Sequence, residues 1–296
     1  MKPAAFEFVA PSTLDEAVAA LVAGGADAKV IAGGQSLVPA LAFRLARPSI
    51  LVDLNRVEAL AGIELDGDTL TIGAMTRHRD VEGFVGLHER CAMIVEAVGE
   101  IGHMAIRNRG TVGGSLAHAD PAAEWAALTL ALDAEFDVAG PAGARTIPAA
   151  DFAYTYFTTA LEPGEVLRCI RLRLPPLGSG SSFVELARRH GDYAISGVGA
   201  VVTLAKDGTV ADSRIALIGV GDRAMRAPSA EAELRGQSPT ADPLAAAAAA
   251  VDADIDPLPD LHASEEYRRQ LAQVLTRRAL AKAVDRASGG DHGRGS

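Results

Sequence analysis

Two short segments pair adjacent glycines with a hydroxyl side chain, and both could bind a diphosphate. Residues 32–37 read Ala-Gly-Gly-Gln-Ser-Leu, and residues 111–117 read Thr-Val-Gly-Gly-Ser-Leu-Ala. A diphosphate is bound by several backbone N–H groups that converge on it; glycine lets the backbone approach without a Cβ clash, and Ser or Thr hydroxyls add donors. Neither segment has the spacing or the lysine of a P-loop, so hydrolysis of ATP or GTP is disfavoured. Together the two segments predict a site that clamps one dinucleotide.

Each segment also has a plainer interpretation. A single Gly-Gly-x-Ser is typical of a turn between a strand and a helix, and the presence of two such segments strengthens the ligand hypothesis only modestly. Arg107 and Arg109, which precede the second segment, either pair with phosphate or remain solvated loop charges. Trp125, which follows it, is expected in the core rather than stacked on a ligand. On these residues alone both interpretations of the segments stay open.

Three other patterns suggest chemistry that their context does not support. Residues 219–224 fit the G-x-G-x-x-A fingerprint of a Rossmann site, but they follow a predicted hairpin and leave no room for a crossover helix before Pro228, so we predict a turn. Residues 113–117 resemble a degraded nucleophile elbow without the surrounding strand and helix that a hydrolase needs. His118, Asp120 and Glu124 are of metal-ligand type, but Pro121 breaks their common helical face. Asp120 is more simply a helix cap.

The elements that must position the two segments are predicted from periodicity and capping signals. A capping box at Thr13–Glu16 begins a helix that stops at the glycines 24–25, and residues 32–37 come directly after a strand. Residues 102–118 show no sustained period and are predicted as a loop, followed by a helix that opens at Pro121. The remaining predicted elements of this part are strands at 29–32, 49–54, 69–74, 134–138 and 166–174 and a helix at 89–99.

The pattern changes after residue 175. Pro/Gly/Ser-rich residues 175–182 are predicted as a linker. Two β-rich runs flank Lys206-Asp207-Gly208, a strong hairpin signal that predicts an antiparallel sheet. We therefore expect an α+β fold. Its predicted parts are an N-terminal α/β subdomain (1–55), a second subdomain (56–176), a C-terminal domain (177–287) that pairs strands 198–205 and 209–218 with helices at 230–234, 244–251 and 265–286, the last capped by Ser264, and a disordered tail (288–296).

Bulk composition excludes several classes of function. The formal net charge is −10 and the chain has no basic run, so nucleic acid is an unlikely partner. Cys91 and Cys169 are the only two cysteines and are far apart, which excludes a disulfide framework or an iron–sulfur cluster held by this chain alone. No window of about 18 apolar residues suggests a transmembrane segment, and the N-terminus does not read as a signal sequence. We expect a soluble, cytoplasmic protein.

Several longer motifs carry a family resemblance. Residues 32–37, the run Ile-Arg-Asn-Arg-Gly-Thr-Val-Gly-Gly-Ser at 106–115 and Ala-His-Ala-Asp-Pro at 117–121 resemble the FAD-binding medium subunit of the xanthine dehydrogenase and aerobic carbon monoxide dehydrogenase family. The similarity continues through residues 72–74, 188–194, 219–223 and 263–268. It implies a two-part FAD-binding domain of the vanillyl-alcohol-oxidase/PCMH type, followed by a smaller C-terminal domain like that of the carbon monoxide dehydrogenase flavoprotein.

The resemblance also implies which residues contact FAD. Residues of the two glycine segments would wrap the diphosphate, residues 72–74 would line the pocket, Asp120 would lie close to the cofactor, and Tyr193 would lie near the isoalloxazine. No catalytic residue and no metal ligand is expected on this chain. The full predicted set is Ala32, Gly33, Gly34, Gln35, Ser36, Leu37, Ile72, Gly73, Ala74, Thr111, Gly113, Gly114, Ser115, Ala117, His118, Asp120, Leu161 and Tyr193.

One position departs from the family pattern. Relatives often have lysine shortly before the Gly-Asp-aromatic-Ala segment, whereas alignment on Gly191-Asp192 places Glu185 there. A cation near the flavin would favour its reduced, anionic form, and a carboxylate would disfavour it. Either Glu185 faces elsewhere, or the reduction potential of the flavin is lowered.

The resemblance implies a division of labour between subunits. A substrate would be oxidised at a molybdopterin cofactor on a large partner, electrons would cross 2Fe-2S clusters on a small partner, and the FAD of this chain would pass them to an external acceptor. A dimer of heterotrimers is the expected assembly. Two alternatives remain: a stand-alone FAD-dependent oxidoreductase of the same fold that acts directly on a small molecule, and a nucleotide-binding regulatory module.

Overall fold

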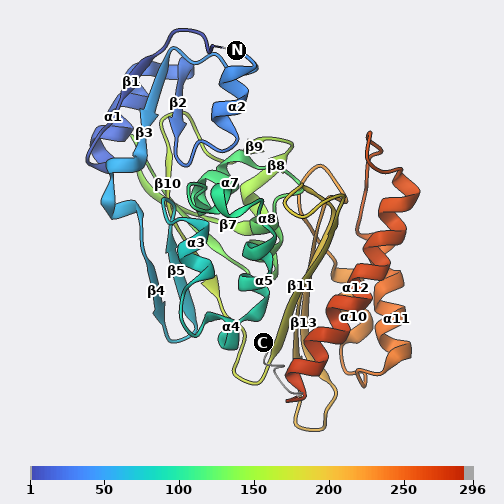
Figure 1. Cartoon of the computed structure of the whole chain (residues 1–296). Helices are drawn as coiled ribbons and strands as arrows, with labels where there is room; N and C mark the ends of the chain where they lie inside the picture. The colour runs from blue at the N-terminus through green and yellow to red at the C-terminus, as the bar shows by residue number, and fades with distance from the viewer. Residues whose placement is uncertain (1, 290–296) are drawn as a thin grey trace. The chain divides into compact units, whose positions relative to one another are not determined.

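The computed structural model describes residues 2–289 and divides into two compact units, each assembled from separate stretches of the chain (Figure 1). The first unit consists of Met1–Val81, His103–Ala119 and Ala134–Leu172, and the second of Glu82–Gly102, Asp120–Asp133 and Arg173–Ser296. The boundaries predicted at residues 55 and 176 stay predictions. The tail predicted for 288–296 lies outside the described residues from residue 290 onward.

The first unit opens with a parallel sheet of three strands in the order β1-β3-β2. These strands are β1 (Glu7–Val9), β2 (Ala28–Ile31) and β3 (Ile50–Asp53), with α1 (Leu14–Gly24) packed on β2 and β3 and α2 (Leu37–Ala42) following β2. The predicted capping box is confirmed: the N–H of Glu16 donates to the Thr13 hydroxyl, and the Glu16 carboxylate accepts from the N–H of Thr13. Apolar residues of α1 and of the sheet form one buried cluster that fixes where residues 32–36 leave β2.

A second sheet of five strands, in the order β4-β5-β10-β6-β7, completes most of the first unit (Figure 1). Its strands are β4 (Ile63–Asp66), β5 (Thr69–Gly73), β10 (Val166–Arg173), β6 (Glu135–Gly140) and β7 (Gly143–Pro148). Strands β4 and β7 were not predicted. The other elements are α3 (His78–Glu82), α6 (Met104–Arg107), α7 (Val112–His118), α9 (Ala149–Phe152), the hairpin β8 (Ala153–Thr155) and β9 (Thr158–Thr159), and 3₁₀ turns at Gly25–Asp27, Leu54–Arg56 and Glu58–Leu60.

The second unit is built on an antiparallel sheet in the order β11-β12-β13-β14, which confirms the α+β class expected for the C-terminal part. Its strands are β11 (Gly180–Ala187), β12 (Ala194–Leu204), β13 (Val210–Ile218) and β14 (Met225–Arg226). The hairpin predicted at Lys206-Asp207-Gly208 joins β12 to β13. The helices are α4 (Leu87–Arg90), α5 (Ala92–Glu100), α8 (Glu124–Ala131), α10 (Pro228–Leu234), α11 (Ala241–Ala250), the 3₁₀ turn Val251–Ala253 and α12 (Glu265–Ala287).

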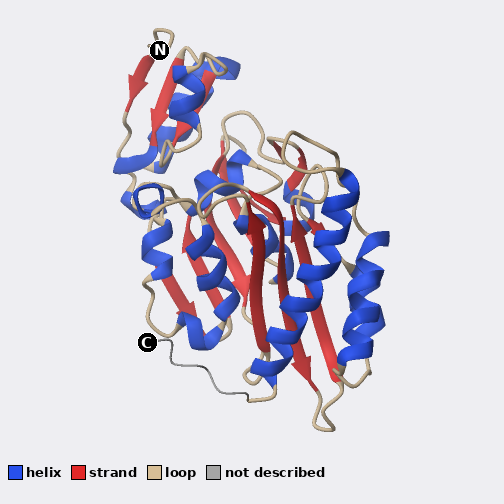
Figure 2. Cartoon of the chain, turned by 45° about the vertical axis from the view of Figure 1, so that its right-hand side comes forward, coloured by secondary structure: helices blue, strands red, loops and turns tan. Residues whose placement is uncertain are grey.

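Helices cover this sheet, and the long helix α12 lies along it (Figures 1 and 2). Helix α12 packs on β11 and β12, and its predicted cap is confirmed, because the N–H of Tyr267 donates to the Ser264 hydroxyl. Helices α5 and α8 also pack on the sheet strands. Trp125 of α8 is fully buried, as expected for a core residue. Residues 219–224 form the predicted turn, since β14 pairs antiparallel with β13 and no crossover helix follows.

Two predictions about the region after residue 88 were wrong in detail. The helix expected at 89–99 is two helices, α4 and α5, separated at Cys91, whose backbone is extended (φ −160°). The helix expected to open at Pro121 begins only at Glu124. Asp120 therefore does not cap it; its carboxylate accepts from the N–H of Ala122 at 2.9 Å and closes a turn before the helix.

The predicted linker 175–182 is in part a strand, because β11 begins at Gly180. The glycine there serves close packing rather than flexibility. A Cβ at Gly180 would lie 1.8 Å from the carbonyl oxygen of Ala283 in α12, so only glycine lets this strand and helix approach each other. Ser182 is buried and donates its hydroxyl to the carbonyl of Ala279 at 2.7 Å.

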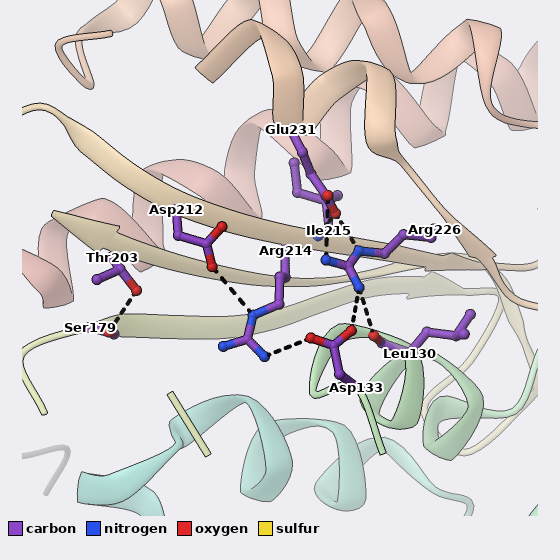
Figure 3. A network of polar contacts seen from close by, with 9 residues as sticks. All are labelled: Leu130, Asp133, Ser179, Thr203, Asp212, Arg214, Ile215, Arg226 and Glu231. Atoms are coloured by element: carbon purple, nitrogen blue, oxygen red, sulfur yellow. Dashed lines mark hydrogen bonds and ion pairs between the residues drawn. The ribbon is translucent and has the colours of Figure 1, made fainter. Parts of the chain in front are cut away.

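An ion-pair network holds the end of α8 to the sheet of the second unit (Figure 3). The carboxylate of Asp133 accepts from Arg226 at 2.9 Å and from Arg214 at 3.2 Å. Arg226 also donates to the carbonyl of Leu130 and to the carboxylate of Glu231, which itself accepts from the N–H of Ile215 at 2.8 Å. The guanidinium of Arg226 thus joins α8 to α10, and Glu231 extends the network to β13.

Loss of Arg226 is expected to destabilise the second unit. Arg226→Ala leaves the carboxylate of Glu231, whose side chain is 12% exposed, without its cation. Removing one partner of a largely buried pair is costly, and we expect the free energy of unfolding to fall by about 2 kcal/mol, as measured by urea denaturation. Arg223→Ala, at an exposed arginine, is the matched control and should change it by no more than about 0.5 kcal/mol. Equal effects of the two variants would contradict the role of the network.

Candidate functional site

The structure brings the two glycine segments together in the first unit. A Cβ at Gly33 would lie 2.3 Å from the carbonyl oxygen of Arg109 and 2.8 Å from the Cα of Gly110. A Cβ at Gly114 would lie 3.5 Å from the Cβ of Ala32. The first segment therefore packs, backbone to backbone, against the residues just before the second, and glycine is required at this contact.

The first segment presents a row of unused hydrogen-bond donors. It runs from the end of β2 to the start of α2, and Gly34 has a left-handed backbone (φ 74°). In the described part of the chain, the backbone N–H groups of residues 33–37 donate to no acceptor, although the carbonyl of Gly33 accepts from the Gln35 side chain at 3.0 Å. Successive free N–H groups around a left-handed residue form a concave binding site for an anion. The row thus fits the phosphates of a cofactor.

The second segment proves to be a helix rather than a loop. Thr111 caps α7, because its hydroxyl accepts the N–H of Gly114 at 3.1 Å. The N–H groups of Val112 and Gly113 donate to the carbonyls of Thr76 and Ala74, at 3.0 and 2.8 Å. The N–H of Ser115 donates to the carbonyl of Thr111, at 3.1 Å. The backbone N–H groups in the first turn of α7 therefore all donate to acceptors within the protein. The prediction that the glycines of this segment mark irregular structure was wrong.

Residues 72–74 lie at the end of β5, where this strand contacts α7. Ile72 is fully buried in β5, so its side chain belongs to the core. A Cβ at Gly73 would meet the carbonyl of Leu60 at 2.4 Å, and one at Gly113 would meet the Cβ of Ala74 at 2.5 Å. The contact at Gly113 explains the small residues at 74 and 113 by close packing of α7 on the end of β5, and the contact at Gly73 explains that glycine by close packing of β5 against the 3₁₀ turn Glu58–Leu60.

The remaining predicted residues of the first unit gather at the opposite end of α7. The ring of His118 lies 5.0 Å from that of Phe157, in a tilted arrangement. The N–H of Phe157 donates to the carbonyl of Ala119 at 3.0 Å, and both residues have left-handed backbones. Leu161, just after β9, donates its N–H to the Thr159 hydroxyl at 3.3 Å. Because α7 has seven residues, this end is about 10 Å from its first turn.

Two predicted residues belong to the second unit. Asp120 closes the turn before α8, and Tyr193, in the connection between β11 and β12, is 57% exposed. Of the two arginines left open, Arg107 is buried on α6, so it is not a solvated loop charge. Arg109 is exposed.

Glu185 has a property that the sequence did not suggest. It lies on β11, and its Oε2 atom is buried with no hydrogen-bond partner among the described residues. Burial, together with the negative charges of Glu124 and Glu100, raises the pKa of Glu185 to about 9. Burial and the nearby charges of Asp120 and Glu100 likewise raise the pKa of Glu124 to about 7. At neutral pH Glu185 is a neutral acid, not a carboxylate.

Sequence reasoning missed Asn55 and Arg77, which link the two glycine segments. Asn55 follows β3 and donates its side-chain amide to the carbonyl of Ala32 at 2.9 Å. Arg77, which precedes α3, donates to the side-chain oxygen of Asn55 and to the carbonyl of Arg109. Neither residue belongs to a recognisable motif, so no signal in the sequence alone would have found them.

Two properties of the described residues complete the description of the site. Within residues 2–289, no group of three His, Cys, Asp or Glu side chains is placed to hold a metal ion. Within the same residues, every helix is too short or too polar to cross a membrane.

Comparison with known families matches nearly the whole chain. Residues 4–175 match the FAD binding domain in molybdopterin dehydrogenase, and residues 181–283 match the CO dehydrogenase flavoprotein C-terminal domain. The chain is 44% identical to the 6-hydroxypseudooxynicotine dehydrogenase complex subunit alpha of Paenarthrobacter nicotinovorans, over 97% of each chain. It is 38% identical to the carbon monoxide dehydrogenase medium chain of Hydrogenophaga pseudoflava, over 97% of this chain and 100% of that one.

The fold agrees with that of a solved relative along nearly its whole length. A chain in a solved structure of carbon monoxide dehydrogenase from Hydrogenophaga pseudoflava superposes with a TM-score of 0.93 at 40% identity, covering 97% of this chain and 99% of that one. Sequence and fold therefore give the same assignment, and the resemblance and the two-part fold expected from the sequence are both confirmed. The chain belongs to the family of FAD-binding medium subunits represented by carbon monoxide dehydrogenase, and it is an oxidoreductase subunit with a FAD-binding domain.

Proposed function

We propose that this chain is the electron-transfer subunit of a molybdenum-containing hydroxylase or dehydrogenase complex. It would take electrons from iron–sulfur clusters on a partner subunit and deliver them to an external acceptor. The observation that carries this proposal is the row of five free N–H groups at residues 33–37, in a chain related to a carbon monoxide dehydrogenase medium chain along 97% of its length. Bound FAD supplies the chemistry, since it exchanges one or two electrons.

Different residues of the first unit would contact different parts of FAD. The N–H groups of residues 33–37 would donate to the diphosphate, and the hydroxyls of Ser36 and Ser115 would add donors. Helix α7 would set the distance between this site and the hairpin β8–β9, where His118 and Leu161 would contact another part of FAD. Asp120 and Tyr193 keep the roles that the resemblance implies, close to the cofactor and near its isoalloxazine.

The proposed partner subunits are inferred from the small number of cysteines in this chain and from the names of its relatives. Its two cysteines, Cys91 and Cys169, cannot ligate a 2Fe-2S cluster. One relative is a complex subunit and another a medium chain, and the solved relative is described as lacking the Mo-pyranopterin moiety of its molybdenum cofactor. We therefore propose a large molybdopterin subunit and a small 2Fe-2S subunit as partners, assembled as a dimer of heterotrimers in the cytoplasm.

Purification from native expression tests this proposal. We expect the complex to contain FAD, iron and molybdenum together, and to release FAD rather than FMN on denaturation, because a diphosphate site serves no purpose for a mononucleotide. The separated chain should remain yellow but should not be reduced by the substrate of the complex. Substrate-dependent flavin reduction by the metal-free single chain would favour a stand-alone oxidoreductase instead. Recovery of FMN alone would contradict the diphosphate site.

A further inference from the structure

We infer that Asn55 and Arg77 form a latch that holds the two cofactor segments in register, and that they are positioning residues for FAD binding. This inference rests on the proposed diphosphate site at residues 33–37. The latch comprises the side chains of Asn55 and Arg77 and the two carbonyls they bind, those of Ala32 and Arg109. All four residues lie in the first unit.

The latch connects the residue before the row of free N–H groups to the residues that precede the second segment. Asn55 donates to the carbonyl of Ala32, the residue directly before the row. Arg77 donates to the carbonyl of Arg109, the atom against which Gly33 packs. Because Arg77 also donates to Asn55, one continuous chain of side-chain hydrogen bonds runs from the first segment to the second. A shift of either segment would break it.

The backbone around Arg77 already belongs to the support of α7. Arg77 forms an isolated antiparallel bridge with Thr111, the residue that caps α7. The neighbouring carbonyl of Thr76 accepts from Val112, and the N–H of His78 donates to the carbonyl of Gly110 at 3.2 Å. The side chain of Arg77 thus projects from a strip of backbone that is fixed to the second segment, and it reaches through Asn55 to the first.

The positive charges of Arg77 and Arg109 favour an anionic ligand next to the latch. Burial, followed by the positive charge of Arg109, lowers the pKa of Arg77. The carboxylates of Asp80 and Asp53 offset this effect only in part. The two guanidinium groups therefore repel each other, and Arg77 donates to the carbonyl against which Gly33, the first residue of the row, packs. An anionic ligand would relieve that repulsion, whereas a neutral one would not. Phosphates at residues 33–37 are the ligand chemistry that this arrangement favours.

The latch predicts how the affinity for FAD changes when Asn55, Arg77 or both are replaced. The full-length chain is stripped of flavin and titrated with FAD, and the dissociation constant is read from quenching of flavin fluorescence. We expect Arg77→Ala and Asn55→Ala each to weaken FAD binding by about tenfold to a hundredfold, as loss of charge-assisted hydrogen bonds predicts. The double variant should be no weaker than the worse single variant, because both belong to one chain of contacts.

Two control variants separate positioning from charge. Arg79→Ala removes the same charge two residues away, at a side chain that is 61% exposed, and should leave the dissociation constant within about twofold. Arg77→Lys keeps the charge but cannot bridge both acceptors, so it should bind FAD nearly as weakly as Arg77→Ala. Wild-type affinity in Arg77→Lys, or an equal loss in Arg79→Ala, would overturn the latch. Additive losses in the double variant would do the same.

Two further measurements are needed. One distinguishes weaker FAD binding from loss of the fold, and the other tests the proposed diphosphate site itself. Urea denaturation of the flavin-free variants should show a much smaller change than the change in affinity, and a parallel change would mean that the pair only stabilises the fold. Gly33→Ala tests the diphosphate site itself. If Gly33→Ala loses FAD while Arg77→Ala and Asn55→Ala retain it, the latch fails and the site stands. If Gly33→Ala retains FAD, the proposed site has failed first.

Discussion

Gly33→Ala should abolish retention of FAD. The added Cβ would lie 2.3 Å from the carbonyl oxygen of Arg109 and 2.8 Å from the Cα of Gly110, and both contacts are to backbone that cannot rotate away. The two segments must then move apart, which displaces the N–H groups of residues 33–37. Loss of two or more charge-assisted hydrogen bonds corresponds to about a hundredfold or more in affinity. We expect purified protein with little bound flavin.

A matched alanine substitution provides the control for this result. A Cβ added at Gly99, in helix α5, would meet no described atom within 4 Å apart from its chain neighbours and the backbone of its own helix. Gly99→Ala should therefore keep full flavin content and be slightly more stable, because alanine has the higher helix propensity. The measurement is the ratio of flavin to protein absorbance after gel filtration. Full flavin content in Gly33→Ala would show that residues 32–37 are only a structural turn.

Glu185→Gln should stabilise the protein at alkaline pH. An ordinary glutamate has a pKa of 4.5, and the folded protein raises that of Glu185 to about 9, chiefly by burial. Between these two values the folded state holds a proton that the unfolded state releases, so stability is fully present below pH 4.5 and is lost progressively as the pH rises towards 9. Glutamine mimics the protonated acid and does not titrate.

The size of this effect follows from the shift. Each pKa unit corresponds to about 1.4 kcal/mol, and partial access of water to the side chain reduces the full value. We therefore expect Glu185→Gln to raise the free energy of unfolding by about 2–3 kcal/mol near pH 8, with little change near pH 5. Urea denaturation at both pH values measures it. Glu89→Gln, at an exposed glutamate in α4, is the control and should change the free energy of unfolding by no more than about 0.5 kcal/mol.

The same variant answers the question raised by the family pattern. Because Glu185 is neutral near pH 7, its replacement by glutamine should leave the reduction potential of bound FAD unchanged there. An upward shift of the potential would mean that a carboxylate faces the flavin. A stability difference that does not vary with pH would likewise contradict the raised pKa.

The sequence by itself determined the elements whose signals are local. The capping box at Thr13, the cap at Ser264 and the Lys206-Asp207-Gly208 hairpin each depend on residues within four positions of one another, and all three were found. The family was identified from the sequence as well, because the motifs that carry the resemblance, such as residues 106–115 and 117–121, can be read directly from the chain.

Only the tertiary structure decided the features that depend on partners distant in sequence. Helix α7 could not be predicted, because Gly113 and Gly114 have low helix propensity and the first N–H groups are satisfied by residues 74 and 76. Gly180 was predicted to lie in a linker, because its close contact with Ala283 of α12 cannot be read from the local sequence. The proton on Glu185 depends on burial and on Glu100 and Glu124, carried by other elements. Such properties arise from burial and from contacts between distant segments, which no local pattern encodes.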